Sequence, residues 1–191
     1  MIPIEVLWMG LIALFGVIGL VRGLWRELGV TTILLLSLFA LKMGQDLILN
    51  ALTTRLPADT LSGLPNETIQ AIYYISTVAF VTFIAYQGIT LVFPIKQQTG
   101  PLKWLFGYLG GLVNGYLIVG TAWDVSSQAD YFGLKVPLGS TGQAIQISDY
   151  LTKLHAAVTR FLPVTLLNAN DFIPYFFLAL GMILLLAIIL K

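Results

Sequence analysis

The chain has 191 residues, of which 58% are hydrophobic and only 10% are charged, whereas soluble domains carry roughly 25% charged residues. Its ten Lys and Arg nearly balance its nine Asp and Glu, which excludes the concentrated basic surface that nucleic-acid binding requires. The sequence has no cysteine and one histidine, His155, so thiolate metal sites are excluded and histidine-ligated cofactors are disfavoured. We therefore expect an integral membrane protein without a catalytic residue, a metal or a bound cofactor.

Five stretches are long and apolar enough to cross a bilayer, whose hydrocarbon core of about 30 Å requires roughly 20 helical residues. They lie at residues 6–21, 29–52, 67–94, 105–123 and 172–190. Asn66 is an expected N-cap of the third helix, and Pro101 suits the first turn of the fourth. The sequence thus predicts an all-α fold, a polytopic membrane bundle of five transmembrane helices.

These stretches divide a single membrane domain, residues 1–191, into three parts. Residues 1–125 form a core of four helices, residues 126–171 an extramembrane segment, and residues 172–190 the fifth helix. Within the middle part, apolar residues recur at helical spacing from 147 to 162, with Ser148 as a cap and Pro163 as the end. This pattern predicts an amphipathic helix on the outer membrane surface; a helix that binds a groove of a partner subunit stays the alternative.

The four tryptophans frame two of the expected spans. Trp8 and Trp25 are 17 residues apart around the first span, and Trp104 and Trp123 are 19 apart around the fourth. These separations correspond to about 25 and 28 Å of helix. We therefore expect all four rings to be anchors at the membrane interfaces, where indole side chains prefer to lie.

Basic residues favour one orientation of the bundle. With five crossings, the loops that hold Arg22, Arg26, Lys96 and Lys103 share a side with Lys191. Because positively charged loops tend to stay in the cytoplasm, we expect the N-terminus outside and the C-terminus inside a bacterial cytoplasmic membrane.

The first candidate site is the segment R-G-L-W-R-E at residues 22–27. Arg22 and Arg26 are four residues apart and would share a face on a continuous helix. Two guanidinium groups there suit lipid headgroups or a partner's carboxylate, and Glu27 can pair with an arginine and fix the turn. The alternative is a topology signal whose side chains snorkel to the headgroups.

The second candidate site is a row of glycines in the fourth span. Gly107, Gly111 and Gly115 follow one another at four-residue steps, next to Asn114. Small residues at this spacing let another helix approach closely, and an amide in hydrocarbon requires a hydrogen-bond partner. We expect helix packing here, within the chain or between subunits.

Together the two segments resemble the colicin V production protein family. The R-G-x-x-R-E motif between two helices is similar to the start of that family, and K-W-L-F-G-Y-L-G-G-L-V-N-G, residues 103–115, is similar to its glycine landmark. The resemblance covers about residues 4–125. It implies a small bacterial inner-membrane protein linked to colicin V production or export and to envelope homeostasis, with no established enzymatic activity.

The chain departs from the family pattern at three positions. Lys103 and Trp104 stand where the family often has an Asp-Arg pair, and Asn114 stands where an arginine is common. A role that depends on those charges does not carry over, whereas a packing role does.

Three functions are compatible with these observations. The resemblance implies envelope homeostasis, toxin production or export support, with the lipid bilayer, other membrane subunits or a second copy as partners. The alternative is an accessory subunit of a respiratory or photosynthetic complex, for which the fifth helix and the amphipathic segment are suited. A transporter or channel is disfavoured, because Asp46 is the only acid expected to reach into a span.

Two further polar patterns are expected to be local. Lys42 and Asp46 have the spacing of an ion pair on the second helix. A polar seam follows the third helix, formed by Thr77, Thr82, Tyr86 and Gln87.

Overall fold

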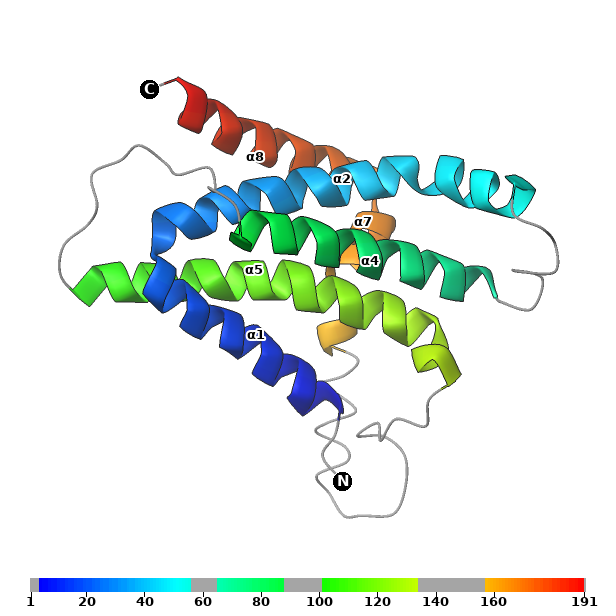
Figure 1. Ribbon diagram of the computed structural model, residues 1–191, viewed down its shortest axis with the longest axis horizontal. Helices are drawn as coiled ribbons and strands as arrows, with labels where there is room; N and C mark the ends of the chain where they lie inside the picture. Colours follow the sequence, from blue (N-terminus) through cyan, green and yellow to red (C-terminus); the bar gives the residue numbers. More distant parts are fainter. Residues whose placement is uncertain (1–3, 56–64, 88–100, 134–156, 191) are drawn as a thin grey trace, which may run out of the picture.

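The computed structural model describes residues 4–55, 65–87, 101–133 and 157–190 (Figure 1). Every element in these ranges is a helix, which confirms the expected all-α bundle. The long helices are α1 (Ile4–Arg22), α2 (Leu24–Arg55), α4 (Asn66–Gln87), α5 (Pro101–Gln128) and α8 (Phe172–Ile189), and the short ones are η1 (Asp130–Gly133) and α7 (Pro163–Ala169). Each long helix contains a stretch apolar and long enough to cross a membrane, so the chain is a multi-pass membrane protein.

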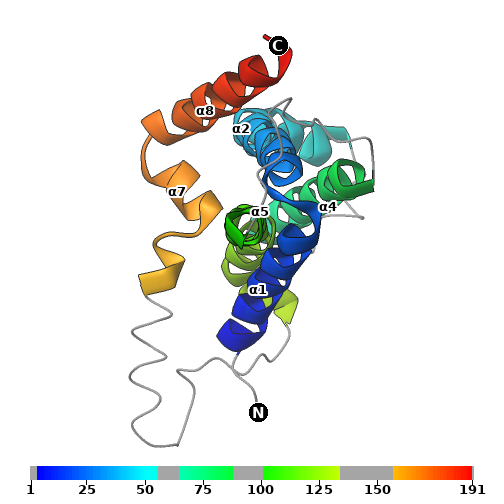
Figure 2. The same cartoon turned by 90° about the vertical axis from the view of Figure 1, so that its left-hand side faces the viewer.

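Helix α5 lies at the centre of the bundle. It contacts α1, α2, α4 and α7, and Figures 1 and 2 show it running between them. Buried aliphatic side chains that include Leu34, Leu38, Val78 and Leu117 join α2, α4 and α5 in one core. Helix α8 packs on α2 and α7 at the edge of the bundle.

A single residue joins α1 to α2. Gly23 has a φ of 82°, a left-handed conformation that glycine adopts without steric cost, and its N–H donates to the carbonyl of Gly19 over 2.8 Å. Because the turn is this short, α2 begins at Leu24 rather than near residue 29. Arg26 and Glu27, whose charges suggest a loop, therefore belong to the first turn of α2.

The surface helix expected before α8 stays a prediction for most of its length. Residues 134–156, which hold most of that expected helix together with Ser148 and His155, lie outside the described residues. Residues 157–159 are helical and a turn follows them. Pro163 then begins α7, since proline fits the first helical turn. Pro163, Val164 and Leu167 are buried, and α7 packs on α5, so this stretch is part of the bundle.

Candidate functional site

Helices α1 and α5 meet backbone to backbone along their glycines. A Cβ atom on Gly111 would overlap the carbonyl oxygen of Phe15, and one on Gly107 would lie 2.5 Å from the carbonyl oxygen of Gly19. A Cβ atom on Gly115 would lie 2.8 Å from the Cβ of Phe15. The structure therefore places all three predicted glycines against α1 of the same chain, at a distance that the lack of side chains permits.

Beside this contact, α2 buries a carboxylate. Glu27 has no exposed surface, and its Oε1 lies 2.9 Å from Nε of Arg22 in an ion pair. A Cβ atom on Gly110 would lie 3.0 Å from the Cβ of Glu27. Glycine at position 110 thus leaves the space between α5 and α2 that the acid occupies.

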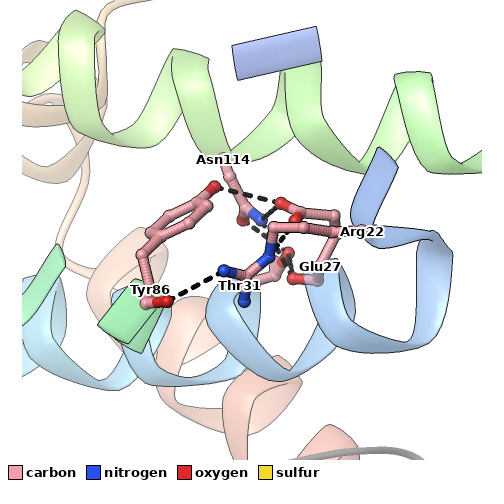
Figure 3. A network of polar contacts seen from close by, with 5 residues as sticks. All are labelled: Arg22, Glu27, Thr31, Tyr86 and Asn114. Atoms are coloured by element: carbon pink, nitrogen blue, oxygen red, sulfur yellow. Dashed lines mark hydrogen bonds and ion pairs between the residues drawn. The ribbon is translucent and has the colours of Figure 1, made fainter. Parts of the chain in front are cut away.

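Asn114 holds Glu27 from the middle of α5 (Figure 3). Its Nδ2 donates to Oε2 of Glu27 over 2.7 Å and to the main-chain carbonyl of Glu27 over 2.9 Å. Its Oδ1 accepts a hydrogen bond of 2.7 Å from the hydroxyl of Thr31, and the hydroxyl of Tyr86 donates to Oε2 of Glu27 over 3.0 Å. Since Asn114 has no exposed surface either, these bonds form away from water.

Arg22 completes the network from the end of α1. Its Nη1 donates to the main-chain carbonyl of Tyr86 over 3.0 Å. Its Cζ lies 4.4 Å from the centre of the Tyr86 ring, within cation–π distance. The last carbonyls of a helix lack intrahelical partners, so Arg22 also caps the C-terminal end of α4.

We refer to Arg22, Glu27, Thr31, Tyr86 and Asn114 as the polar network. Its members come from α1, α2, α4 and α5, and the donors around Glu27 compensate its negative charge. An unpaired charge in such a dry place is costly, so the network stabilises the packing that keeps its members together. The arrangement joins the end of α1, the first turns of α2 and the end of α4 to the middle of α5.

This geometry corrects one member of the contact expected with lipid headgroups or a partner at Arg22, Arg26 and Glu27: Glu27 is buried, whereas a contact of the exposed Arg26 stays a prediction. Because Gly23 interrupts the helix, the two arginines do not share a face: Arg22 turns to Glu27, whereas Arg26 is exposed. Glu27 has no surface with which to touch a headgroup. The expected pairing of Glu27 with an arginine beside the turn agrees with the structure.

Among the expected interface anchors, Trp123 is a wrong prediction. Its side chain has no exposed surface and lies against Trp8, with 6.3 Å between ring centres. Its Nε1 donates to the hydroxyl of Tyr131 over 3.3 Å. Neighbouring aromatic rings, and not lipid, therefore surround the indole. Trp8 and Trp25 are half-buried and Trp104 is 56% exposed, and their places at the membrane interfaces stay predictions.

Asp124 is a further buried carboxylate, and it was not singled out from the sequence. It is 2% exposed and accepts hydrogen bonds from the main-chain N–H of Thr165 (2.6 Å), the Thr165 hydroxyl (2.9 Å) and Nε2 of Gln128 (2.7 Å). Helix α7 has no side-chain cap of its own. Asp124 therefore supplies from α5 the negative charge and acceptor that a helix N-terminus favours.

The expected pair of Lys42 and Asp46 is replaced by a longer-range bond. Nζ of Lys42 donates to Oδ1 of Asn168 over 2.6 Å, while Asp46 is exposed. Among the described residues, the buried acids are Glu5, Glu27 and Asp124, so the expectation that Asp46 alone reaches into a span is wrong.

Only part of the expected polar seam on α4 faces the interior of the bundle. Tyr86 belongs to the polar network, and the Thr82 hydroxyl is buried without a hydrogen-bond partner among the described residues. Gln87 is exposed at the end of the helix.

Comparison of the chain with protein-family models, with curated proteins and with solved structures found no match. Its function is therefore inferred from its residues and their geometry.

Proposed function

We propose that this chain is a non-catalytic multi-pass protein of a bacterial cytoplasmic membrane that supports envelope homeostasis, toxin production or export. Its resemblance to colicin V production proteins implies this role. The observation that carries the proposal is a contact between the two segments on which the resemblance depends. Segment 22–27 supplies Glu27, and segment 103–115 supplies Asn114, whose Nδ2 donates to the Glu27 carboxylate over 2.7 Å.

The same two segments also meet through their packing. Gly107 and Gly111 lie against the backbone of Gly19, just before the first segment, and Gly110 lies against Glu27. Two short motifs far apart in the chain thus build one structural unit. Such a unit supports the view that the resemblance extends to the fold of the core.

Asn114 stands where the family often has an arginine, so this position lacks the positive charge but still offers a hydrogen-bond donor to Glu27. Its amide reaches Glu27 from the buried face of α5, where an arginine would offer the same acid a donor. The members of the polar network use one another as donors and acceptors. This closed arrangement favours a structural role over chemistry on a substrate.

The second candidate function, an accessory subunit of a larger membrane complex, is favoured by α8. Pro174 and Gly181 are the buried residues of this helix, and its remaining surface is largely apolar side chains at the edge of the bundle. A peripheral helix with such a surface suits lipid or a neighbouring subunit equally well.

Purification from native membranes in a mild detergent separates these two candidates. A large complex of fixed stoichiometry would make the chain an accessory subunit. A single chain or a homo-oligomer, from a host in which deletion of the gene raises envelope permeability, supports the export and homeostasis role. Ion or solute flux in liposomes that contain only this chain would contradict both.

Complementation of the deletion tests the carrying observation itself. Asn114→Leu removes the donors to Glu27 at similar volume, and we expect it to fail to restore envelope permeability. Ile84→Leu changes an exposed side chain of α4 outside both segments and is the matched control. Full complementation by Asn114→Leu would show that the contact between the two segments does not matter for function.

For orientation, we propose the N-terminus outside and the C-terminus in the cytoplasm. The α1–α2 turn, the start of α5 and the end of α8 lie at the same end of the bundle (Figure 1). Arg26 and Lys103 are at this end, and the positive-inside tendency assigns it to the cytoplasm.

A further inference from the structure

Two cations flank the turn between α1 and α2. Cε of Lys103, in the first turn of α5, lies 3.9 Å from the position of a Cβ atom on Gly23. Arg26 is exposed in the first turn of α2, three residues after Gly23. Glu27 compensates Arg22, whereas neither Arg26 nor Lys103 has an ionic or hydrogen-bond partner among residues 4–55, 65–87, 101–133 and 157–190.

Helix α5 carries an apolar face that no other described helix covers. The face begins at Leu102, next to Lys103, and runs toward the middle of the helix. The side chains on this face are between 36% and 58% exposed: Leu102, Leu105, Phe106, Leu109 and Val113. Their spacing puts them on one side of the helix. From Leu102 to Val113 the face is about 16 Å long at 1.5 Å per residue, close to the thickness of about 15 Å of one leaflet of hydrocarbon.

This open face has defined borders. On one side, Gly16 of α1 contacts Tyr108 and Leu112 of α5. Two turns beyond Val113, on the same side of α5, the ring of Pro163 lies 3.0 Å from the position of a Cβ atom on Gly120. The first residue of α7 thus covers the continuation of the face and leaves only its half next to Lys103 open.

We propose that this open face of α5 is a binding site for an anionic phospholipid. The headgroup phosphate binds Lys103 and Arg26, and one acyl chain lies along the face from Leu102 to Val113. Charge complementarity favours a lipid over a helix of a partner. One uncompensated cation, Lys103, lies in the first turn of α5 at the end of the face, a second, Arg26, is exposed within one helical turn of Gly23 on α2, and the length of the face matches one leaflet. The site holds whether the chain acts in export or within a complex.

The two cations are expected to give a measurable preference for anionic over zwitterionic lipid. A basic side chain near an anionic membrane surface contributes about 1 kcal/mol, or roughly a fivefold change in binding. The two cations together therefore favour an anionic over a zwitterionic headgroup by about 25-fold. Acyl contact adds a dependence on chain length, because each buried methylene group contributes to lipid binding.

Native mass spectrometry of the full chain in mild detergent tests the site, with equal amounts of phosphatidylglycerol and phosphatidylcholine of the same acyl length. We expect retention of phosphatidylglycerol at least about tenfold above phosphatidylcholine. The double variant Arg26→Gln/Lys103→Gln loses this preference. Arg160→Gln, which removes an exposed arginine elsewhere, keeps it.

A dihexanoyl phosphatidylglycerol competitor separates lipid binding from simple anion binding. It has the same headgroup, but its chains are too short to cover the face, so we expect retention to fall more than about tenfold. Equal retention of the short and long forms would reduce the site to an anion contact and overturn the proposal. Equal retention of both headgroups by the wild-type chain, or a dimer without lipid, would also overturn it, even if the double variant failed to fold.

Discussion

Asn114 donates from one amide nitrogen to both the carboxylate and the main-chain carbonyl of Glu27, over 2.7 and 2.9 Å. The middle of α5 is thereby tied to the first turn of α2 at a point where neither residue touches solvent or lipid. Substitution of this one amide therefore tests how much the contact between α2 and α5 contributes to stability.

Replacing Asn114 by leucine should destabilise the chain. The substitution keeps the volume but leaves the Glu27 carboxylate short of a donor, and a hydrogen bond to a charged group contributes about 2 kcal/mol. We expect Tm in detergent to fall by about 4–8 °C. Tryptophan fluorescence during heating measures this, and Val113→Leu on the exposed side of α5 should leave Tm unchanged.

The ion pair between Arg22 and Glu27 should show strong coupling. Removing one member leaves a buried charge and costs about 3–5 kcal/mol, whereas replacing both by apolar groups costs much less. We expect Arg22→Met and Glu27→Leu each to lower Tm more than the double variant does. Additive losses in this double-mutant cycle would mean that the pair contributes no interaction energy.

The glycine contact between α1 and α5 should not tolerate a methyl group. A Cβ atom on Gly111 would overlap the carbonyl of Phe15, whereas one on Gly10, in α1, has nothing within 4 Å. We expect Gly111→Ala to lower Tm clearly and Gly10→Ala to leave it unchanged or raise it slightly, since alanine is the better helix former. A fall in Tm for both variants alike would argue against a close contact at Gly111.

Asp124 should control the docking of α7. Asp124→Ala removes the acceptor at the N-terminus of α7, a cap that is worth about 1 kcal/mol. The chain has no cysteine, so a Leu167→Cys variant reports on α7 alone, because Leu167 is buried. We expect maleimide to label Cys at this position several times faster in the Asp124→Ala background; equal rates would exclude a docking role.

The proposed orientation can be checked with the same cysteine-free background. An impermeant maleimide added to intact cells should label Arg160→Cys and leave Arg26→Cys unlabelled until the membrane is opened. The opposite pattern would place the α1–α2 turn outside the cell. Labelling of both positions before opening would contradict a transmembrane bundle.

Much of the fold follows from local properties of the sequence. A run such as Phe172–Ile189 carries no charge and is long enough to span a bilayer, so its helix can be recognised without knowing its neighbours. The spacing of Gly107, Gly111 and Gly115 likewise indicates a packing face, because small residues matter wherever helices touch.

The polar network could not be predicted from those local properties. Glu27 follows Arg22 and Arg26 and has the pattern of a loop residue. It is buried because Gly23 shortens the turn to one residue. Asp124 follows an apolar span and gives no sign that Thr165 lies opposite. Both depend on which helices pair in space, and one sequence does not contain that information in readable form.

The one-residue turn at Gly23 fixes the rotational phase of α2 relative to α1. A longer loop could accommodate an inserted residue, but here only Gly23 separates α1, which ends at Arg22, from α2, which begins at Leu24. One residue inserted after Gly23 would rotate every side chain of α2 by about 100° and carry Glu27 away from Asn114. The length of this turn therefore determines which side chains of α2 face α5. Inserting or deleting one residue here should destabilise the fold far more than most substitutions elsewhere.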